Sequence, residues 1–391
     1  MSSVITSLKN VDPATAIVAL IFVASGSVST IASKWQDDIS AVGRACPVDE
    51  PDCASGKSHL FDHPFVQTWF MFLGEFVCMI LHLLTLAYKR VKQIELQEGV
   101  DFMKPVTPLI FMIPSFCDFT GSTTMYIGLT LTEASVYQML RGATVLFTGI
   151  FSMIFLKRRF QAFEWLGMSL VTAGLACVGL ASMLFSSGDS SAPNPVVGDI
   201  LILAAQLIVA GQMVIEEKIL TKYNVPPRLL VAWEGTFGLC YATTALGIFQ
   251  AWPKSGPSLN GHNPPDDFID ATTQMSNDWR LIFSNVLCVL AITFLNAAGQ
   301  TITKNVSATA RMVLDTVRNV IVWGVCLAIP FFKEDFQYMQ LIGFILLIGG
   351  NAVFKAILRL PCAALQPAPT EAEQSKLLDN DVEPASVTGS S

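Results

Sequence analysis

The chain has 391 residues, of which 52% are hydrophobic and only 14% are charged, and its formal net charge is −7. Soluble domains carry about 25% charged residues, so this composition excludes an ordinary soluble protein and indicates a polytopic membrane protein. The acidic balance and the lack of a basic aromatic cluster argue against a nucleic-acid partner and leave the lipid bilayer and a solute.

Apolar runs predict the membrane spans. A helix of about 20 apolar residues crosses a bilayer core. The runs predict ten spans, at 14–32, 65–88, 107–130, 135–156, 163–185, 197–216, 229–250, 281–303, 309–332 and 337–358. Residues 1–13 form the predicted N-terminal segment, and residues 361–391 have the Pro-, Ser- and acid-rich composition of a disordered tail.

Basic residues predict the orientation. With both termini in the cytoplasm, cytoplasmic segments receive more lysine and arginine than the opposite ones. The longer loops 34–64 and 251–279 are then lumenal or extracellular. Cys46 and Cys53 lie in the first loop, where a disulfide, a metal clip and two free thiols are all compatible with the sequence.

The second half of the sequence resembles the first, with matching motifs in the same order. The matches align Arg141 with Arg318 and Asp118 with Asn296. Each half, 14–185 and 186–360, contains five spans, so the halves enter the membrane in opposite orientations. We therefore expect an all-α fold of ten transmembrane helices in two inverted five-helix repeats, which is typical of secondary transporters and less so of channels.

Charged and polar residues within the spans are candidates for function. Tyr137, Arg141, Thr144 and Thr148 share one helical face, so Arg141 is expected to line a cavity or to be paired inside the bundle. Glu75 and Glu234 are the only acids of two corresponding spans. A buried carboxyl group can carry a proton or simply hydrogen-bond to a neighbouring helix. Glu75, Asp118 and Glu234 are therefore candidates for proton coupling or cavity polarity.

Span nine adds a charged triad. Arg311, Asp315 and Arg318 have helical spacing, and the triad either neutralises itself or leaves an excess of guanidinium. Arginine offers a rigid fork of donors to phosphate or carboxylate, so we expect an anionic solute. The candidate substrate-binding residues are Tyr137, Gln138, Arg141, Gln206, Gln212, Asn296, Arg311, Asp315 and Arg318.

Small residues in spans five and ten have a different interpretation. Gly167, Gly174 and Gly179, and Gly343, Gly349 and Gly350, indicate close helix packing in a scaffold or at a homodimer face. No enzyme motif is present, and the four histidines, His59, His63, His82 and His262, have no metal-ligand spacing. The sequence therefore predicts no catalysis, no cofactor and no metal site.

Several motifs together resemble the drug/metabolite transporter superfamily, with its EamA-like and nucleotide-sugar-transporter-like members. FLGEF (72–76), CDFTG (117–121), QMLRGA (138–143), EEK (216–218) and SATARMVLD (307–315) are similar to subfamily F of solute carrier family 35, over about 15–359. The resemblance implies a transporter of nucleotide sugars or other anionic metabolites. The lysine-rich ninth-span signature of nucleotide-sugar carriers has no match, because Arg311 and Arg318 occupy that region.

The tail contains a candidate sorting signal. Glu373, Leu377 and Leu378 fit the acidic dileucine pattern, which predicts sorting adaptors as partners and a lysosomal membrane rather than the Golgi or plasma membrane. The sequence thus predicts a secondary transporter of an organic, anionic solute in an endomembrane. Two alternatives stay open: a non-transporting scaffold or receptor on a transporter fold, and a carrier of cationic drug-like compounds.

Overall fold

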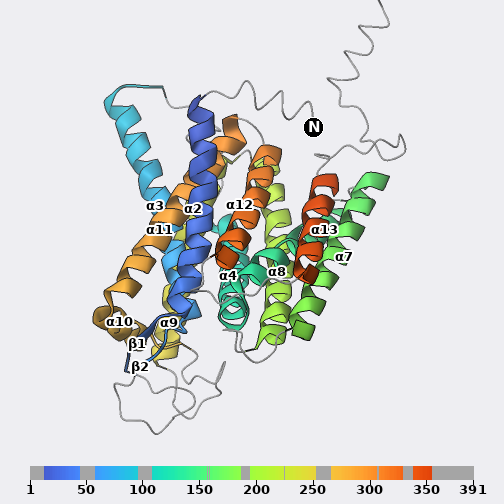
Figure 1. Cartoon of the computed structure of the whole chain (residues 1–391). Helices are drawn as coiled ribbons and strands as arrows, with labels where there is room; N and C mark the ends of the chain where they lie inside the picture. The colour runs from blue at the N-terminus through green and yellow to red at the C-terminus, as the bar shows by residue number, and fades with distance from the viewer. Residues whose placement is uncertain are drawn as a thin grey trace, which may run out of the picture.

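The structure, a computed structural model, describes residues 13–44, 58–95, 108–155, 157, 159–185, 194–223, 225–251, 266–305, 308–328 and 338–354. These residues form a helical bundle with one small β-ribbon (Figure 1). The elements are α2 (Pro13–Asp37), β1 (Ser40–Val42), β2 (Ser58–Leu60), α3 (Pro64–Val91), η1 (Pro108–Phe111), α4 (Met112–Leu131), α5 (Ala134–Leu140), α6 (Ala143–Phe155), α7 (Ala162–Phe185), α8 (Pro195–Tyr223), α9 (Pro227–Gln250), α10 (Phe268–Asn277), α11 (Trp279–Asn305), α12 (Ala308–Ala328) and α13 (Tyr338–Phe354).

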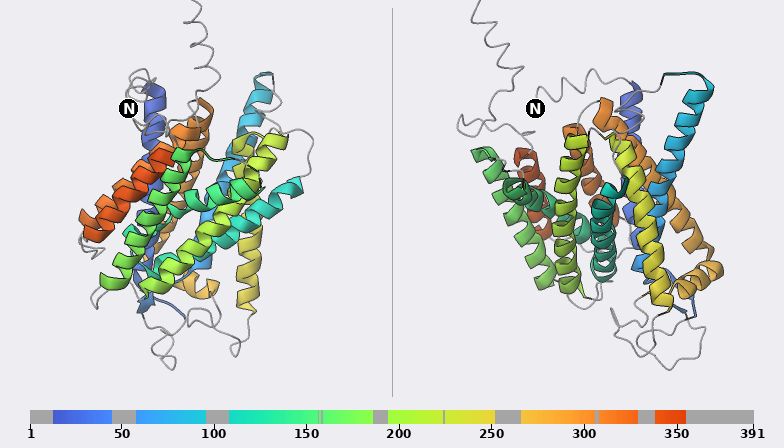
Figure 2. Two further views of the ribbon diagram at one scale, coloured as in Figure 1. Left: turned by 90° about the vertical axis from the view of Figure 1, so that its right-hand side faces the viewer. Right: turned by 180° about the vertical axis from the view of Figure 1, so that it is seen from behind.

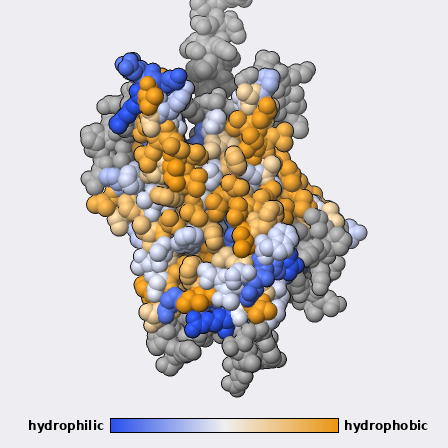
Figure 3. All heavy atoms as spheres, turned by 90° about the vertical axis from the view of Figure 1, so that its left-hand side faces the viewer, coloured by the Kyte–Doolittle hydropathy of each residue, from blue (hydrophilic) through white to orange (hydrophobic). Residues whose placement is uncertain are grey.

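Within this part of the chain, six helices are long and apolar enough to cross a membrane. They are Pro13–Asp37, Pro64–Val91, Val136–Phe155 (α5 and α6 counted together), Ala162–Ala181, Pro195–Leu220 and Trp279–Ile302. Figure 3 shows a face whose middle is covered by hydrophobic residues, with hydrophilic residues gathered towards its upper and lower ends. Exposed apolar side chains on α3 and α11, such as Leu84 and Val286, are what a lipid-facing surface requires. The fold is therefore that of a polytopic membrane protein, and ten spans stay a prediction.

Helices of the two halves pack against each other in pairs. The main pairs are α7 with α13, α3 with α9, α2 with α11 and α4 with α8. When each span is matched to its predicted counterpart, the first two pairs map onto themselves and the last two exchange. Figures 1 and 2 show α7 and α13 side by side. This pairing is what an approximate twofold axis between the halves would produce.

Glycines allow α7 and α13 to approach closely. A Cβ atom on Gly174 would lie 2.8 Å from the carbonyl oxygen of Gly343, and one on Gly350 would lie 2.8 Å from that of Gly167. The expectation of close packing is confirmed at these four positions. Gly179 and Gly349 have no atom within 4 Å of such a Cβ, so they do not contribute to this contact.

Helices α2 and α8 extend well beyond their predicted ends. The loop predicted to begin at residue 34 starts later, because α2 continues to Asp37 and buries Lys34. The Lys34 Nζ atom donates to the carbonyl oxygens of Leu129 (3.2 Å) and Thr132 (3.1 Å), which would otherwise be unsatisfied at the end of α4. Likewise, α8 continues to Tyr223, past the predicted end at Glu216.

The two predicted long loops contain structure and meet at one end of the bundle. In the first, β1 and β2 pair antiparallel, with Ala41 opposite His59. In the second, α10 lies against this ribbon (Figure 1). The Asn277 side-chain amide donates to the Val42 carbonyl oxygen at 2.7 Å. This assembly closes the same end of the bundle from both halves of the chain.

Candidate functional site

The predicted fourth span is not continuous. It is divided into α5 and α6 at Arg141 and Gly142, where the backbone hydrogen bonds change from the i to i−4 pattern to the i to i−3 pattern. The Gly142 N–H donates to Met139 O (3.0 Å), and the Thr144 N–H donates to Arg141 O (3.2 Å). The single helical face expected for this stretch is therefore interrupted at Arg141. Broken helices commonly mark solute sites of transporters, because their free backbone groups and side chains face the interior.

Arg141 belongs to a group that we call the arginine cluster, formed by Arg141 with Arg311, Asp315 and Arg318 of α12. The Arg318 Nη2 atom lies 3.0 Å from Asp315 Oδ1, and Arg318 also interacts electrostatically with Arg141 and Arg311. Arg141 lies over the ring of Tyr137, 5.8 Å from its centroid. The four residues of this cluster comprise three guanidinium groups and one carboxylate, which leaves an excess of positive charge among them.

The neighbouring helices leave room for these arginines. A Cβ atom on Gly26 of α2 would overlap Cδ of Arg318, and one on Gly299 of α11 would lie 2.9 Å from Nε of Arg311. Both arginines therefore pack directly against helix backbones, which fixes their positions more firmly than long flexible side chains alone would allow.

Arg318 retains unused hydrogen-bond donors. Its side chain is 4% exposed, whereas that of Asp315 is 45% exposed. Its Nε and Nη2 atoms make no hydrogen bond to the residues that the structure describes; the approach of Nη2 to Asp315 has ion-pair distance without hydrogen-bond geometry. Buried donors without acceptors are costly, so they favour a ligand that supplies acceptor oxygens.

A second group, the carboxyl cluster, joins four helices. It consists of Glu75 (α3), Asp118 (α4), Glu216 (α8) and Glu234 (α9). Glu75 interacts electrostatically with Asp118 and Glu216, and Glu216 hydrogen-bonds to Glu234. Two carboxyl groups can share a hydrogen bond when one of them is protonated, so the placing of Glu216 against Glu234 suits a site that can take up a proton.

Amide side chains complete the carboxyl cluster. Gln212 hydrogen-bonds to both Asp118 and Glu216, and Asn296 hydrogen-bonds to Glu75. Glu75 Oε2 and Glu234 Oε1 accept no hydrogen bond within the described part of the chain. These free oxygens can bind a proton, a water molecule or a cationic group.

The two clusters are electrostatically connected. Arg311 interacts with Glu216 of the carboxyl cluster and with Asp315 of its own cluster. Uptake of a proton or an anion at one cluster therefore changes the electrostatic potential at the other.

The predicted substrate-binding residues do not form one site in the structure, because they lie in different parts of the bundle. Gln212 and Asn296 belong to the carboxyl cluster, whereas Gln206 accepts a hydrogen bond from Thr144 next to Arg141. Gln138 is fully buried and donates to Thr30 Oγ1 at 2.8 Å, which links α5 to α2. The other predicted site residues lie outside the described residues: Cys46, Cys53, Glu373, Leu377 and Leu378.

Glu216 is the residue that the sequence interpretation missed as a site acid. The sequence places it at the end of the predicted span 197–216. In the structure α8 continues for two further turns, and Glu216 lies within the bundle. Glu216 is four residues from Gln212, so both lie on one helical face. This spacing is the feature of the sequence that could have identified Glu216 as a residue of the site.

The fold and its polar interior define a multi-pass membrane protein. Residues 57–349 match the model of the nucleotide-sugar transporter family. The chain is similar to solute carrier family 35 member F6 of Homo sapiens, with 38% identity over 365 residues that cover 92% of this chain and 95% of the relative.

Two other relatives are similar over smaller shares or at lower identity. An uncharacterised protein of Schizosaccharomyces pombe is 32% identical over 89% of this chain and 99% of its own length. CMP-sialic acid transporter 2 of Oryza sativa subsp. indica is 23% identical over 57% of this chain and 59% of its own length. The chain therefore belongs to the nucleotide-sugar transporter family and resembles member F6 of solute carrier family 35.

Proposed function

We propose that this protein is a ten-span secondary transporter that moves an organic, anionic solute across an endomembrane by alternating access. The carrying observation is Arg318, a buried arginine beside Arg141 whose Nε and Nη2 atoms make no hydrogen bond to the described residues. A phosphate or carboxylate group would satisfy these donors as a bidentate ligand. The names of the relatives point to nucleotide sugars as the first solutes to test.

In this proposal the carboxyl cluster couples transport to protons. Glu75, Asp118, Glu216 and Glu234 cannot all be ionised while they lie against one another in a medium of low dielectric constant. Protons are the compensating charge when no cation is bound. The link between Arg311 and Glu216 supports a mechanism in which anion binding and proton binding stabilise each other.

Alternating access follows from the proposed inverted repeat. The helix pairs that exchange between the halves, and the reciprocal glycine contacts of α7 and α13, support two similar halves related by an approximate twofold axis. Rocking of one half against the other would expose the two clusters to either side in turn.

Uptake into proteoliposomes tests this proposal. Purified protein is reconstituted and given CMP-sialic acid, UDP-galactose and a pool of phosphorylated metabolites, amino acids and small peptides, with and without a pH gradient. We expect accumulation that Arg141→Ala abolishes while the variant remains folded. Normal uptake by Arg141→Ala would show that the arginine has only a structural role.

A carrier of cationic compounds is the second candidate, and the carboxyl cluster favours it. Glu75 Oε2 and Glu234 Oε1 are free to accept from an ammonium group. Uptake of a cationic compound that is lost in Glu234→Gln and retained in Arg318→Lys would support this candidate over the anion carrier.

We also propose a lysosomal location with both termini in the cytoplasm, where Glu373, Leu377 and Leu378 are accessible to sorting adaptors. Changing Leu377 and Leu378 to alanine is expected to move the protein to the plasma membrane. Unchanged lysosomal staining would contradict this part of the proposal.

A further inference from the structure

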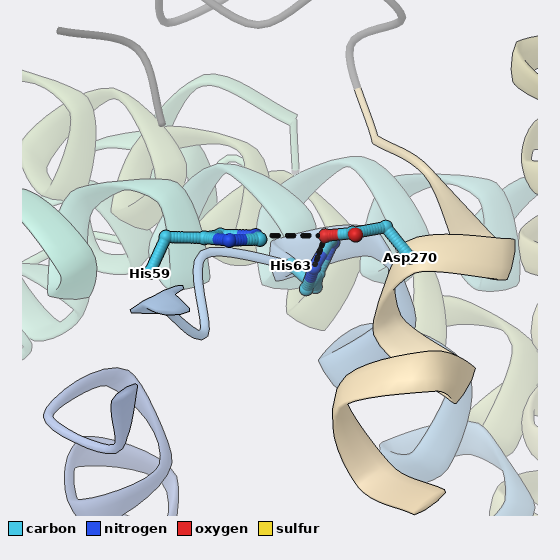
Figure 4. Close-up of side chains that lie close together, drawn as sticks. All are labelled: His59, His63 and Asp270. Atoms are coloured by element: carbon cyan, nitrogen blue, oxygen red, sulfur yellow. Dashed lines mark hydrogen bonds and ion pairs between the residues drawn. The ribbon is translucent and has the colours of Figure 1, made fainter. Parts of the chain in front are cut away.

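The closed end of the bundle contains a cluster of imidazole and carboxylate groups that the transport proposal does not use. We call His59, His63, Asp266 and Asp270 the histidine–aspartate cap. His59 lies in β2, His63 directly precedes α3, and Asp270 lies in the first turn of α10 (Figure 4). The cap therefore joins the segment before α3 to the segment before α11.

The donor atoms of the cap converge on one carboxylate oxygen. Asp270 Oδ2 lies 2.9 Å from His59 Nε2 and 3.2 Å from His63 Nε2. Dashed lines in Figure 4 mark both contacts. These three side chains are 13% exposed or less, and the three atoms that could bind a metal ion, one from each side chain, lie within 4.8 Å of one another. The site is thus buried, with its most accessible edge at His59.

The surroundings hold the ligand atoms in place. Asp266 Oδ1 lies 2.7 Å from His63 Nδ1, and its Oδ2 accepts the backbone N–H groups of Phe65 (2.9 Å) and Val66 (3.3 Å). The other oxygen of Asp270 accepts the backbone N–H of Arg44. A carboxylate on the second nitrogen of a histidine is the usual way to fix the tautomer and ring orientation of a metal ligand.

Glycine is also required next to the cap. A Cβ atom on Gly43 would overlap Asp270 Oδ1 and come into close contact with the ring of His59. No side chain other than hydrogen fits there while both groups keep their positions. The backbone at Gly43 therefore packs directly against the side chains of Asp270 and His59.

The unusual contact is that between His63 Nε2 and Asp270. The nitrogen makes no hydrogen bond of acceptable geometry within the described residues, although the oxygen is 3.2 Å away. With Nδ1 directed at Asp266, the Nε2 atom of a neutral His63 would present a lone pair to a carboxylate. A positive charge between the two atoms removes this repulsion.

That charge is either a proton or a metal ion. A metal ion that binds here displaces a proton, as metal ions do at most histidine sites.

We propose that His59 Nε2, His63 Nε2 and Asp270 Oδ2 bind a divalent metal ion of the Zn²⁺ class, with Asp266 as the positioning residue of His63. Two imidazoles and one carboxylate are a common Zn²⁺ ligand set, and a water molecule would fill the fourth position. Ligand atoms of tetrahedral Zn²⁺ are separated by about 3.3 to 3.5 Å. Asp270 Oδ2 lies 2.9 and 3.2 Å from the two nitrogen atoms, and all three atoms lie within 4.8 Å of one another, so side-chain shifts can bring them to this spacing.

Bound metal would fasten the β-ribbon to α10 and α3. Without it the ribbon and α10 are joined by weaker contacts, such as the Asn277 amide to Val42 O. The metal would then stabilise the closed end of the bundle without contacting the arginine or carboxyl cluster.

Metal titration of the full-length protein in detergent or nanodiscs tests the proposal. After chelator treatment and desalting, ZnCl₂ is added and bound zinc is measured by mass spectrometry together with Tm. We expect about one Zn²⁺ per chain and a higher Tm in the wild type. His59→Gln and Asp270→Asn should each lose at least about tenfold in affinity.

Asn277→Ala is the matched control. It removes a polar contact between the ribbon and α10 but leaves every proposed ligand in place, so it should bind Zn²⁺ like the wild type. Equal zinc binding by the wild type, His59→Gln and Asp270→Asn would overturn the proposal, and so would a folded wild type that binds none.

X-ray absorption of the zinc-loaded wild type needs no variant. We expect a first shell of nitrogen and oxygen with imidazole scattering. A shell that contains sulfur would place the metal at cysteines and overturn the proposal, whatever the variants show.

Discussion

The arginine cluster and the carboxyl cluster lie in the same membrane interior but hold charge in different ways. Arg318 and Arg311 stay charged at any physiological pH and are fixed by close packing against Gly26 and Gly299. The acids of the carboxyl cluster interact with one another and with two amide side chains. Binding or release of protons can change their charge. The comparison teaches that one bundle can hold a group of permanent positive charges beside a group of acids whose charge depends on protonation.

Coulomb's law shows how strongly like charges repel inside such a bundle. Two unit charges about 4 Å apart interact by about 4 kcal/mol at an effective dielectric constant of 20. Ionising neighbouring acids of the carboxyl cluster at the same time is therefore unfavourable unless a proton or a cation compensates the charge. The arginines cannot lose their charge by releasing a proton, so a bound anion is what would compensate the excess positive charge of their cluster.

The largest expected effect is that of removing the permanent charge. Arg318→Met should lower the transport efficiency for an anionic solute about 100-fold, because charge-assisted hydrogen bonds contribute about 1.5–3 kcal/mol. Arg318→Lys keeps the charge but loses the planar fork and should retain more activity. Uptake rates in proteoliposomes measure both. If Arg318→Met and Arg318→Lys were equally inactive, the charge itself would not be the deciding property.

The next effect comes from removing the adjustable charge. Glu234→Gln keeps a hydrogen-bonding side chain next to Glu216 but cannot exchange a proton. We expect solute to equilibrate across the membrane and no longer to accumulate in response to a pH gradient. The ratio of internal to external solute at steady state is the measurement, and Asn277→Ala serves as a variant distant from both clusters. Full gradient-driven accumulation in Glu234→Gln would remove this residue from proton coupling.

A smaller effect is expected from the packing that positions Arg318. Gly26→Ala places a methyl group on Cδ of Arg318, which should cost about 1–3 kcal/mol and reduce the apparent affinity for solute. Gly179→Ala is the matched control, since its Cβ would meet nothing within 4 Å. It should be neutral or stabilise α7 by up to about 1 kcal/mol. Equal effects of the two variants on affinity would show that Gly26 does not position the arginine.

The smallest effect on transport is expected at Lys34, outside both clusters. Lys34→Met leaves the carbonyl oxygens of Leu129 and Thr132 without their donor, which should cost about 1–3 kcal/mol of stability. Thermal unfolding should show this loss, whereas transport per folded molecule should stay unchanged. A transport defect larger than that of Gly26→Ala would mean that the end of α4 takes part in the transport cycle.

The sequence predicts the helical membrane fold well, because long apolar runs are unambiguous. It does not predict the break at Arg141 and Gly142, since hydropathy treats the stretch as one apolar run and the change to i to i−3 bonding is local. It also places Lys34 in a loop and Glu216 at a span end. Both polar residues continue their helices because they find buried partners in distant elements.

The candidate site is predicted in part. The arginines and three of the four acids are recognisable as charges inside apolar runs. Their division into two clusters is not, because Gln212 and Asn296 could join either group until the helices are placed. The histidine–aspartate cap has no local signal, since Asp270 lies more than 200 positions from His59 and His63 in the sequence.

The most direct test of the two-cluster account measures solute and protons together. Proteoliposomes loaded with a pH-sensitive dye receive CMP-sialic acid, UDP-galactose or the best solute from the pool, and solute entry and internal pH are followed at once. The account predicts that wild-type protein moves both, that Glu234→Gln moves solute without protons, and that Arg318→Met moves neither. Proton entry that persists in Glu234→Gln, or solute entry that persists in Arg318→Met, would contradict it.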